Sequence, residues 1–418
     1  MVDSVFIGDD FTGASDTLAT LAEAGYRTRL FLQAPDPDTV ATLDLDAVGI
    51  ATDLRAQPPA EIDARLRALG PALADLSPRV LHYKVCSTFD SAPDVGSIGA
   101  AVLALEQGLK PSLTAVIGGQ PSLGRFCVFG NLFARAPDGV VYRIDRHPIM
   151  SRHPTTPMGE ADLRIHLAAQ GLADLMLVPR GEEHATVEHL DARQQTSPAR
   201  LLFDAVGGKD IARIGSVLRA LETNDQPLLI IGSSSVAEAL AAGRAKPLTD
   251  PTNGKLPPVS GPRLILAGSR SSATAAQIAA AFGYERVPLR RSDLTAEGLP
   301  ACAQQCAAKL AGGTNVLVHL LAERDYGLSP NALSERLADL AVAITRQHPV
   351  RALGVAGGDT SSAVVHRLGF ESLSFERRAG SGVAICRGHA PSSSLDGTRL
   401  LLKGGQVGPV DLFDRFLT

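Results

Sequence analysis

The stretch Val5-Phe6-Ile7-Gly8-Asp9-Asp10-Phe11-Thr12-Gly13-Ala14 carries the pattern that decides the fold of this chain. An apolar run typical of a strand ends in two carboxylates, a hydroxyl and a glycine, and apolar residues then recur at helical spacing through Ala22. In an open α/β sheet, ligands bind at the carboxyl ends of such strands. Asp9 and Asp10 therefore either cap the following helix, or take a proton, bind Mg²⁺ or hold sugar hydroxyls.

A second strand-to-helix junction lies in Leu353-Gly354-Val355-Ala356-Gly357-Gly358-Asp359-Thr360-Ser361-Ser362-Ala363. Its paired glycines permit close backbone approach, and the free N–H groups at a helix start favour phosphate. Alone, the motif is equally typical of an ordinary βα turn. Two more Gly-rich strand ends, Gly268-Ser269-Arg270 and Lys403-Gly404-Gly405, occur in the same half of the chain and together indicate a shared nucleotide site.

The type of nucleotide site follows from the motifs that are missing. No Gly-x-Gly-x-x-Gly follows a strand, which disfavours a dinucleotide-binding fold, and no Gly-x-x-x-x-Gly-Lys-Ser/Thr is present, which excludes a P-loop. An NAD-dependent sugar-acid dehydrogenase is therefore disfavoured. A phosphoryl-transfer enzyme in which closure excludes water fits this arrangement better.

Short apolar runs alternate with amphipathic stretches along all 418 residues. Continuous apolar strands separated by helices predict parallel sheets covered on both faces. We expect an α/β protein of two domains, each a largely parallel sheet covered by helices, with a ligand crevice between them. Four prolines and a glycine mark 246–260 as a linker between an N-terminal domain over 1–245 and a C-terminal domain over 261–418.

Composition narrows the class of protein. With 45% hydrophobic and 20% charged residues the chain is typical of a globular protein, and its net charge of −4 argues against nucleic acid as a partner. No apolar run is long enough for a membrane span, and no secretory segment opens the chain. Five cysteines, an odd number in mostly apolar surroundings, favour a reducing cytoplasm over a disulfide framework.

A polar motif follows another apolar strand in the N-terminal half, at Lys84-Val85-Cys86-Ser87-Thr88-Phe89-Asp90-Ser91. A lysine with hydroxyls and a carboxylate at a strand end suits a small anionic ligand, although loops are often polar without a ligand. Arg55, just beyond a further strand, either clamps a carboxylate or is a surface arginine. The repeated Arg-His-Pro at 146–148 and 152–154 is either an anion-binding segment or a structural loop, and its spacing does not indicate a metal site.

These motifs make the chain resemble the four-carbon acid sugar kinase family along nearly its whole length. The resemblance rests on six motifs in the family's order: Gly8 to Ala14, Lys84 to Ser91, His153 to Met158, Gly268 to Ser271, Gly357 to Ser361 and Lys403 to Gly405. It implies ATP-dependent phosphorylation of a primary hydroxyl on a short acid sugar. The family's N-terminal domain holds the acid and its C-terminal domain holds ATP, with Mg²⁺ bridging the triphosphate.

The resemblance also implies roles for individual residues. Those expected to contact the substrate are Asp10, Arg55, Lys84 and Ser87, and those expected to contact ATP are Ser269, Gly357, Gly358, Asp359, Thr360 and Gly404. From their chemistry we add Thr12, Thr88 and Asp90 to the substrate group and Gly405 to the nucleotide group. Asp10, Asp9 and Lys84 are the expected catalytic residues. We assign no side chain as a direct metal ligand, although Asp359 could place Mg²⁺ through water.

The substrate is narrowed but not settled by the Lys84–Ser91 motif. Members acting on threonate or erythronate tend to carry Asp at the position of Cys86 and Arg at that of Asp90, so this chain looks more like the 3-oxo-tetronate 4-kinases. A branched acid such as 3-oxo-isoapionate stays open as the substrate. A non-catalytic sugar-acid sensor is the alternative outside enzymology, and a homodimer fits a small-molecule kinase of this size.

Overall fold

The computed structural model of the chain describes residues 2–185, 199–223, 225–242, 259–380 and 382–417. Its contacts divide the chain into two compact units. Unit 1 comprises Met1–Asp9, Thr20–Thr28 and Ala34–Pro251, and unit 2 comprises Asp10–Ala19, Arg29–Gln33 and Thr252–Thr418. The expected two-domain α/β class is confirmed, and most of the linker expected over 246–260 lies outside the described residues.

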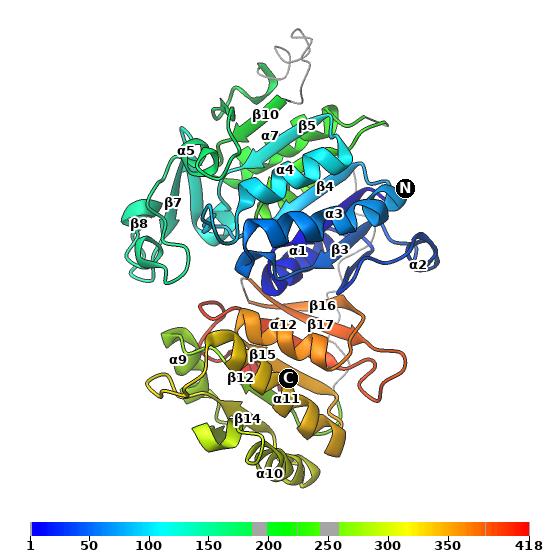
Figure 1. The fold of residues 1–418 in the computed structure, drawn as a ribbon, viewed down its shortest axis with the longest axis vertical. Coiled ribbons are helices and arrows are strands. Elements are labelled where there is room, and N and C mark those ends of the chain that lie inside the picture. Colours follow the sequence, from blue (N-terminus) through cyan, green and yellow to red (C-terminus); the bar gives the residue numbers. More distant parts are fainter. Residues whose placement is uncertain (1, 186–198, 224, 243–258, 381, 418) are drawn as a thin grey trace. The chain divides into compact units, whose positions relative to one another are not determined.

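Unit 1 is built on a seven-stranded sheet whose neighbouring strands all run parallel (Figure 1). In spatial order the strands are β3 (Ala47–Ala51), β1 (Ser4–Gly8), β4 (Val80–Lys84), β11 (Leu228–Gly232), β5 (Leu113–Ile117), β10 (Ala199–Phe203) and β9 (Met176–Val178). Strands β1, β3, β4, β5 and β11 are buried along their whole length, which explains their continuous apolar sequences. The alternating apolar runs of the sequence predicted strands of this kind.

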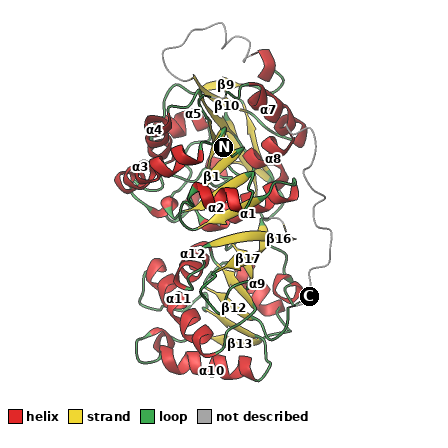
Figure 2. Cartoon of the chain, turned by 90° about the vertical axis from the view of Figure 1, so that its right-hand side faces the viewer, coloured by secondary structure: helices red, strands yellow, loops and turns green. Residues whose placement is uncertain are grey.

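Helices cover both faces of the unit 1 sheet (Figures 1 and 2). On one face lie α3 (Pro59–Leu76), which begins at a proline, and α4 (Ile98–Leu109), which Ser97 caps. On the other face, α7 (Gly208–Ala220) and α8 (Ser235–Ala242) pack their apolar residues on the sheet in one core cluster. The same part of the chain also contains the helices α1 (Phe11–Glu23), α2 (Pro37–Thr42) and α5 (Leu163–Ala168).

A separate antiparallel sheet of three strands is inserted into unit 1. It consists of β6 (Arg125–Val128), β7 (Asn131–Arg135) and β8 (Val141–Arg143). Its strands β6 and β7 contain mostly half-buried residues with a few buried ones between them, unlike the fully buried strands of the large sheet. The sequence did not predict this sheet.

Unit 2 has an eight-stranded sheet of mixed direction. Five strands are parallel: β13 (Glu285–Pro288), β14 (Val316–His319), β12 (Leu264–Ala267), β15 (Ala352–Ala356) and β18 (Arg399–Lys403). Three further strands continue it in antiparallel pairing: β17 (Val383–His389), β16 (Ser372–Gly380) and β2 (Thr28–Phe31). The parallel part matches the expected sheet, whereas the antiparallel part was not predicted.

The unit 2 sheet is also covered on both faces (Figure 2). Along one face lie α10 (Leu299–Ala311), α11 (Pro330–Gln347) and α12 (Gly358–Arg367), each packed on the next. Against the other face pack α9 (Ser272–Ala280) and α13 (Leu412–Arg415), with Ile278 and Phe413 in the core cluster. The loops at the carboxyl ends of the parallel strands are thereby left between the two helical layers, where α/β proteins bind ligands.

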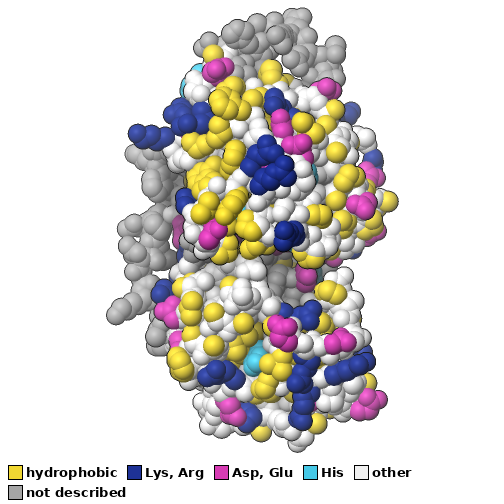
Figure 3. Space-filling model, turned by 90° about the vertical axis from the view of Figure 1, so that its left-hand side faces the viewer, with side chains coloured by type: hydrophobic (Ala, Val, Ile, Leu, Met, Phe, Trp, Pro, Cys, Tyr) yellow, Lys and Arg dark blue, Asp and Glu magenta, His cyan; other side chains and the backbone are white. Residues whose placement is uncertain are grey.

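No helix in the described part of the chain is long and apolar enough to cross a membrane. On the face drawn in Figure 3, acidic, basic and apolar side chains are intermixed.

Candidate active site

Three of the expected catalytic and acid-sugar residues, Asp9, Arg55 and Lys84, lie at or just after the carboxyl ends of strands in the unit 1 sheet. Gly8 at the end of β1 pairs in parallel register with Ala51 of β3 and with Lys84 of β4. The three strands therefore end side by side, and the chain leaves them carrying Asp9, Arg55 and Lys84. Arg55 lies in a short 3₁₀ turn directly after β3.

Asp9 and Arg55 form a bidentate ion pair. The Arg55 Nη2 and Nε atoms donate to the two Asp9 carboxylate oxygens over 2.7 and 3.1 Å, and the Arg55 backbone N–H donates to the Asp9 carbonyl over 2.9 Å. The Asp9 side chain is 5% exposed and that of Arg55 26%. This pair gives the buried carboxylate two charge-assisted hydrogen bonds and orients the guanidinium at the strand edge.

Lys84 is buried, and its ammonium donates to the Val85 carbonyl oxygen over 2.8 Å. The loop that follows is held by its own side chains. The Cys86 thiol lies 2.9 Å from the Thr88 hydroxyl, and this hydroxyl donates to Asp90. Burial and the Asp90 charge raise the pKa of Cys86 to about 11, so its thiol stays protonated at neutral pH. Ser87, beside them, is half-buried.

Two residues that sequence reasoning missed support this loop from α5 and its C-terminal end. His166 Nε2 lies 2.9 Å from the Ser91 hydroxyl and 3.1 Å from the Phe89 carbonyl, and Gln170 donates to the Ser91 hydroxyl over 2.8 Å. Phe89 is fully buried in a left-handed conformation with φ of 53°. Such a conformation costs energy for a bulky residue, so these partners hold a strained loop in place.

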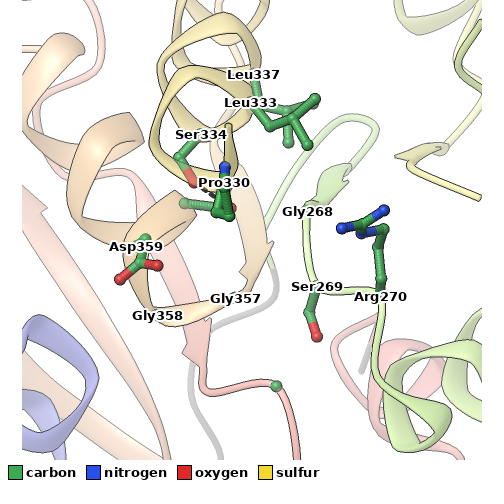
Figure 4. Close-up of a pocket in the computed structure, with 12 residues that line it drawn as sticks. Gly268, Ser269, Arg270, Pro330, Leu333, Ser334, Leu337, Gly357, Gly358 and Asp359 are labelled. Atoms are coloured by element: carbon green, nitrogen blue, oxygen red, sulfur yellow. Dashed lines mark hydrogen bonds between the residues drawn. The ribbon is translucent and has the colours of Figure 1, made fainter. Parts of the chain in front are cut away.

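Six of the expected nucleotide residues of unit 2, all except Gly404, line one pocket of about 210 Å³ (Figure 4). Gly357 and Gly358 begin α12 on one side, and Ser269 and Arg270 follow β12 on the other. The remaining lining residues are Gly268, Pro330, Leu333, Ser334, Leu337, Asp359, Thr360 and Gly405. Sequence reasoning missed the contribution of α11, because Pro330 to Leu337 look only like an amphipathic helix.

The backbone at Gly357 requires glycine. Its φ is +127°, and a Cβ atom there would lie 3.1 Å from the Thr360 hydroxyl and 3.2 Å from the Ser269 nitrogen. The Gly268 and Ser269 N–H groups both donate to the Ala356 carbonyl over 2.9 Å, which ties the two glycine turns together. An open space at the N-terminus of a ten-residue helix suits phosphate oxygens.

Asp10 and Thr12 belong to the contacts of unit 2 and lie beside these turns. The Thr12 hydroxyl lies 3.7 Å from the position of a Cβ on Gly358 and 3.8 Å from that on Gly404. It donates to an Asp10 carboxylate oxygen over 2.7 Å, and the other oxygen accepts from the Gly13 N–H over 3.1 Å. Asp10 thus makes the capping contact that the sequence allowed, and its half-buried carboxylate lies next to the glycine turns as well.

The Gly404–Gly405 turn is held by polar side chains to which the sequence assigned no individual contact. The Gly405 carbonyl accepts from Ser271 Oγ over 2.6 Å, from Thr274 Oγ1 over 3.0 Å and from Lys403 Nζ over 3.1 Å. A Cβ on Gly405 would lie 2.8 Å from Ser269 Oγ. The turn is therefore packed closely against the turn after β12.

Acidic side chains that could bind a metal are few at this edge of unit 2 in the described part of the chain. In the described residues, no group of three or more His, Cys, Asp and Glu side chains could hold a metal ion by itself. Asp359 lines the pocket with an exposed carboxylate, and carboxylate oxygens are the donors that Mg²⁺ accepts together with substrate phosphates. The donors present therefore fit a Mg²⁺ ion that arrives with a nucleotide.

The histidines of the Arg-His-Pro repeat hold their own loop. His147 Nδ1 accepts from the Ile149 and Met150 N–H groups over 3.2 Å each, and His153 Nδ1 accepts from the Thr156 N–H over 3.1 Å. Burial lowers the pKa of His147, which keeps this ring neutral and able to accept. These contacts favour the interpretation of the Arg-His-Pro repeat as a structural loop over its interpretation as an anion-binding segment.

Known proteins match the chain over nearly its whole length. Residues 4–240 match a family model described as a sugar-binding N-terminal domain, and residues 264–413 match one described as a nucleotide-binding C-terminal domain. A 3-oxo-isoapionate kinase from Paraburkholderia graminis is 36% identical, over 98% of this chain and 92% of that protein. A 3-oxo-tetronate kinase from Cupriavidus necator is 32% identical, over 98% of this chain and 95% of that protein.

Solved structures agree with these matches. A crystal structure from Salmonella typhimurium LT2 superposes with a TM-score of 0.79 and 26% identity, covering 99% of this chain and 98% of that one. Haemophilus influenzae protein HI1011 shares the fold with a TM-score of 0.74 and 24% identity, covering 99% of this chain and 98% of that one. With both family models matched in order and full-length relatives above 30% identity, the chain belongs to the four-carbon acid sugar kinase family of carbohydrate kinases.

Proposed function

We propose that this protein transfers the γ-phosphoryl group of ATP to the terminal primary hydroxyl of a short 3-oxo acid sugar of the 3-oxo-tetronate type. The observation that carries the proposal is the Asp10–Thr12 pair beside Gly358 and Gly404. Thr12 Oγ1 lies within 4 Å of the Cβ positions of both glycines and donates to Asp10. A carboxylate next to a phosphate-binding turn is the arrangement that phosphoryl transfer to a hydroxyl needs.

The nucleotide residues bind phosphates mainly through backbone N–H groups. Those of Gly357 to Thr360 open α12 and act together with the dipole of this helix. The phosphates also contact the two neighbouring turns, which contain Ser269 and Gly404–Gly405. Mg²⁺, when bound with ATP, neutralises phosphate charge, and Asp359 would hold it through water.

The acid-sugar residues bind and orient the substrate. Lys84 and Arg55 attract the carboxylate of the acid, with Arg55 kept in orientation by Asp9. Ser87, Thr88 and Asp90 offer hydrogen-bonding groups to the sugar hydroxyls. Asp10 accepts the proton of the attacking hydroxyl, and Lys84 alternatively stabilises the moving phosphoryl group as a point charge.

A second substrate has a specific observation in its favour. The 3-oxo-isoapionate kinase from Paraburkholderia graminis is 36% identical to this chain, compared with 32% for the 3-oxo-tetronate kinase from Cupriavidus necator. A branched 3-oxo acid of this kind carries the same carboxylate and a primary hydroxyl. It is therefore the alternative substrate for the same site.

The test is a coupled ADP-release assay with Mg-ATP and a panel of acids. The panel contains 3-oxo-tetronates, 3-oxo-isoapionate, D- and L-threonate and D-erythronate. Turnover of a 3-oxo acid well above that of the threonates and erythronate supports the proposal and decides between the two substrates. Turnover of threonate or erythronate alone rejects the 3-oxo class, and acid binding without any ADP release supports a sensor.

A further inference from the structure

Lys403, the last residue of β18, is fully buried and carries a charge without a counter-ion among the described residues. Its ammonium donates to Thr274 Oγ1 over 2.8 Å and to the Gly405 carbonyl over 3.1 Å, and both acceptors are uncharged. Burying an ammonium without a paired carboxylate costs free energy. Consistent with this cost, burial lowers the pKa of Lys403 to about 8.

Lys403 connects two of the glycine turns that line the pocket. Its backbone carbonyl accepts from the Gly357 N–H over 2.9 Å, while its side chain binds the Gly405 carbonyl. Thr274 Oγ1 accepts from the ammonium and donates to the same Gly405 oxygen. The turn at Gly405 and the start of α12 are thus both fixed to one residue.

We propose that Lys403 is a positioning residue of the nucleotide site, whose buried ammonium fixes the Gly404–Gly405 turn and supplies the positive charge that nucleotide phosphates neutralise. The inference rests on the proposed binding of ATP. Gly405 lines the pocket whereas Lys403 does not, and the Gly405 carbonyl oxygen lies 3.1 Å from the ammonium. The ammonium therefore lies behind the wall of the pocket, where water does not screen its charge from a phosphate bound at this turn. A merely structural residue at this point would contribute more to stability as an uncharged, apolar side chain.

The decisive experiment compares the wild-type protein with Lys403→Met, which keeps the length of the side chain and removes its charge. Calorimetric titration with ADP measures nucleotide affinity without the acid sugar. We expect the Kd for ADP and the KM for ATP to rise by about tenfold to a hundredfold, the effect of losing a hydrogen-bonded charged group. The KM for the acid sugar stays unchanged, and the melting temperature does not fall, because an uncompensated buried charge has been removed.

The matched control is Lys309→Met, which removes a partly exposed lysine of the same unit that pairs with Glu285. It leaves the Kd for ADP at the wild-type value. A Lys403→Met protein that binds ADP like the wild type, or that melts lower with an unchanged KM for ATP, overturns the inference. If the wild type itself binds neither ADP nor ATP, the proposed nucleotide function fails and the role of Lys403 fails with it.

A second variant decides the question if Lys403→Met does not fold. Thr274→Val removes the hydroxyl that joins the ammonium to the Gly405 carbonyl. A raised Kd for ADP with an unchanged KM for the acid sugar supports the inference. A wild-type Kd for ADP in this variant overturns it.

Discussion

The hydroxyl oxygen of Thr12 lies 3.7 Å from the position that a Cβ atom would occupy on Gly358. The same hydroxyl donates to Asp10 over 2.7 Å. Asp10 follows the first strand of the chain, and Gly358 opens a helix more than three hundred residues later. The contact links the two motifs that the sequence singled out most strongly, and it makes Asp10 the first residue to test.

Asp10→Asn should lower kcat by about 10²- to 10⁴-fold, the usual contribution of a general base, because an amide cannot take the proton of the attacking hydroxyl. Asparagine caps helices as well as aspartate does, so the contact with the Gly13 N–H and the melting temperature should persist. Steady-state kinetics and a thermal melt measure both effects. The control is Asp75→Asn, an exposed position on α3. A kcat close to that of the wild type would remove Asp10 from the mechanism.

Gly358→Ala tests whether phosphate approaches the backbone at the start of α12. A Cβ there meets only Thr12 Oγ1 at 3.7 Å, an ordinary contact, so the melting temperature should not fall. The methyl group nevertheless occupies space in front of the helix N-terminus. We expect the KM for ATP to rise by about tenfold or more, since phosphate would lose backbone hydrogen bonds. An unchanged KM would mean that the phosphates bind elsewhere.

Gly357→Ala should behave differently although it is the adjacent residue. Here φ is +127° and the new Cβ would lie 3.1 Å from Thr360 Oγ1, so the substitution strains the folded state itself. We expect a loss of about 1–3 kcal/mol in the free energy of unfolding, measured by urea denaturation. Stability equal to that of the Gly358→Ala protein would contradict the backbone geometry described for this turn.

Asp9→Asn should destabilise unit 1 through Arg55. The buried carboxylate receives two hydrogen bonds from this guanidinium, and an asparagine amide can neither supply the negative charge nor accept both of them. We expect a loss of about 3 kcal/mol in the free energy of unfolding and a higher KM for the acid sugar, because Arg55 is no longer held in orientation. Arg67→Met, which removes an exposed ion pair with Asp63, is the control and should change stability far less. Equal effects of the two variants would show that the Asp9–Arg55 pair is not needed.

The sequence predicted the parts of this protein that local patterns determine. The continuous apolar strands β1, β4 and β15 were found because a strand buried on both faces contains little else. The polar residues at their ends were singled out because several strand ends of this kind occur in one chain, whereas each motif alone is also typical of an ordinary turn. Binding by these residues stays a prediction until it is measured.

What the sequence could not predict depends on partners brought together by folding. Strand β16 contains Glu376 and Arg378 and looks polar, yet these side chains bind Arg399 and Asp16 from distant parts of the chain. Lys403 belongs to the Lys403–Gly405 motif, but the sequence assigned no role to its side chain. Only the folded structure shows that its ammonium is buried against Thr274. Side chains that hold a loop from another helix, such as His166, leave no pattern in the loop's own sequence.

The stability of the protein should fall as the pH drops below about 6.5, and His82 should account for part of this dependence. His82 is 1% exposed on β4, and desolvation lowers its pKa from 6.5 to about 3. Between these two pH values the unfolded chain binds a proton at His82 that the folded chain does not, so protonation favours unfolding. The loss of unfolding free energy from this group approaches about 1.4 kcal/mol per pH unit.

Urea denaturation at a series of pH values across this range measures the slope for the wild type and for His82→Gln. The variant should show a shallower slope whatever its absolute stability, since only the titrating group has been removed. Parallel curves for the two proteins would mean that His82 is not held neutral in the folded state.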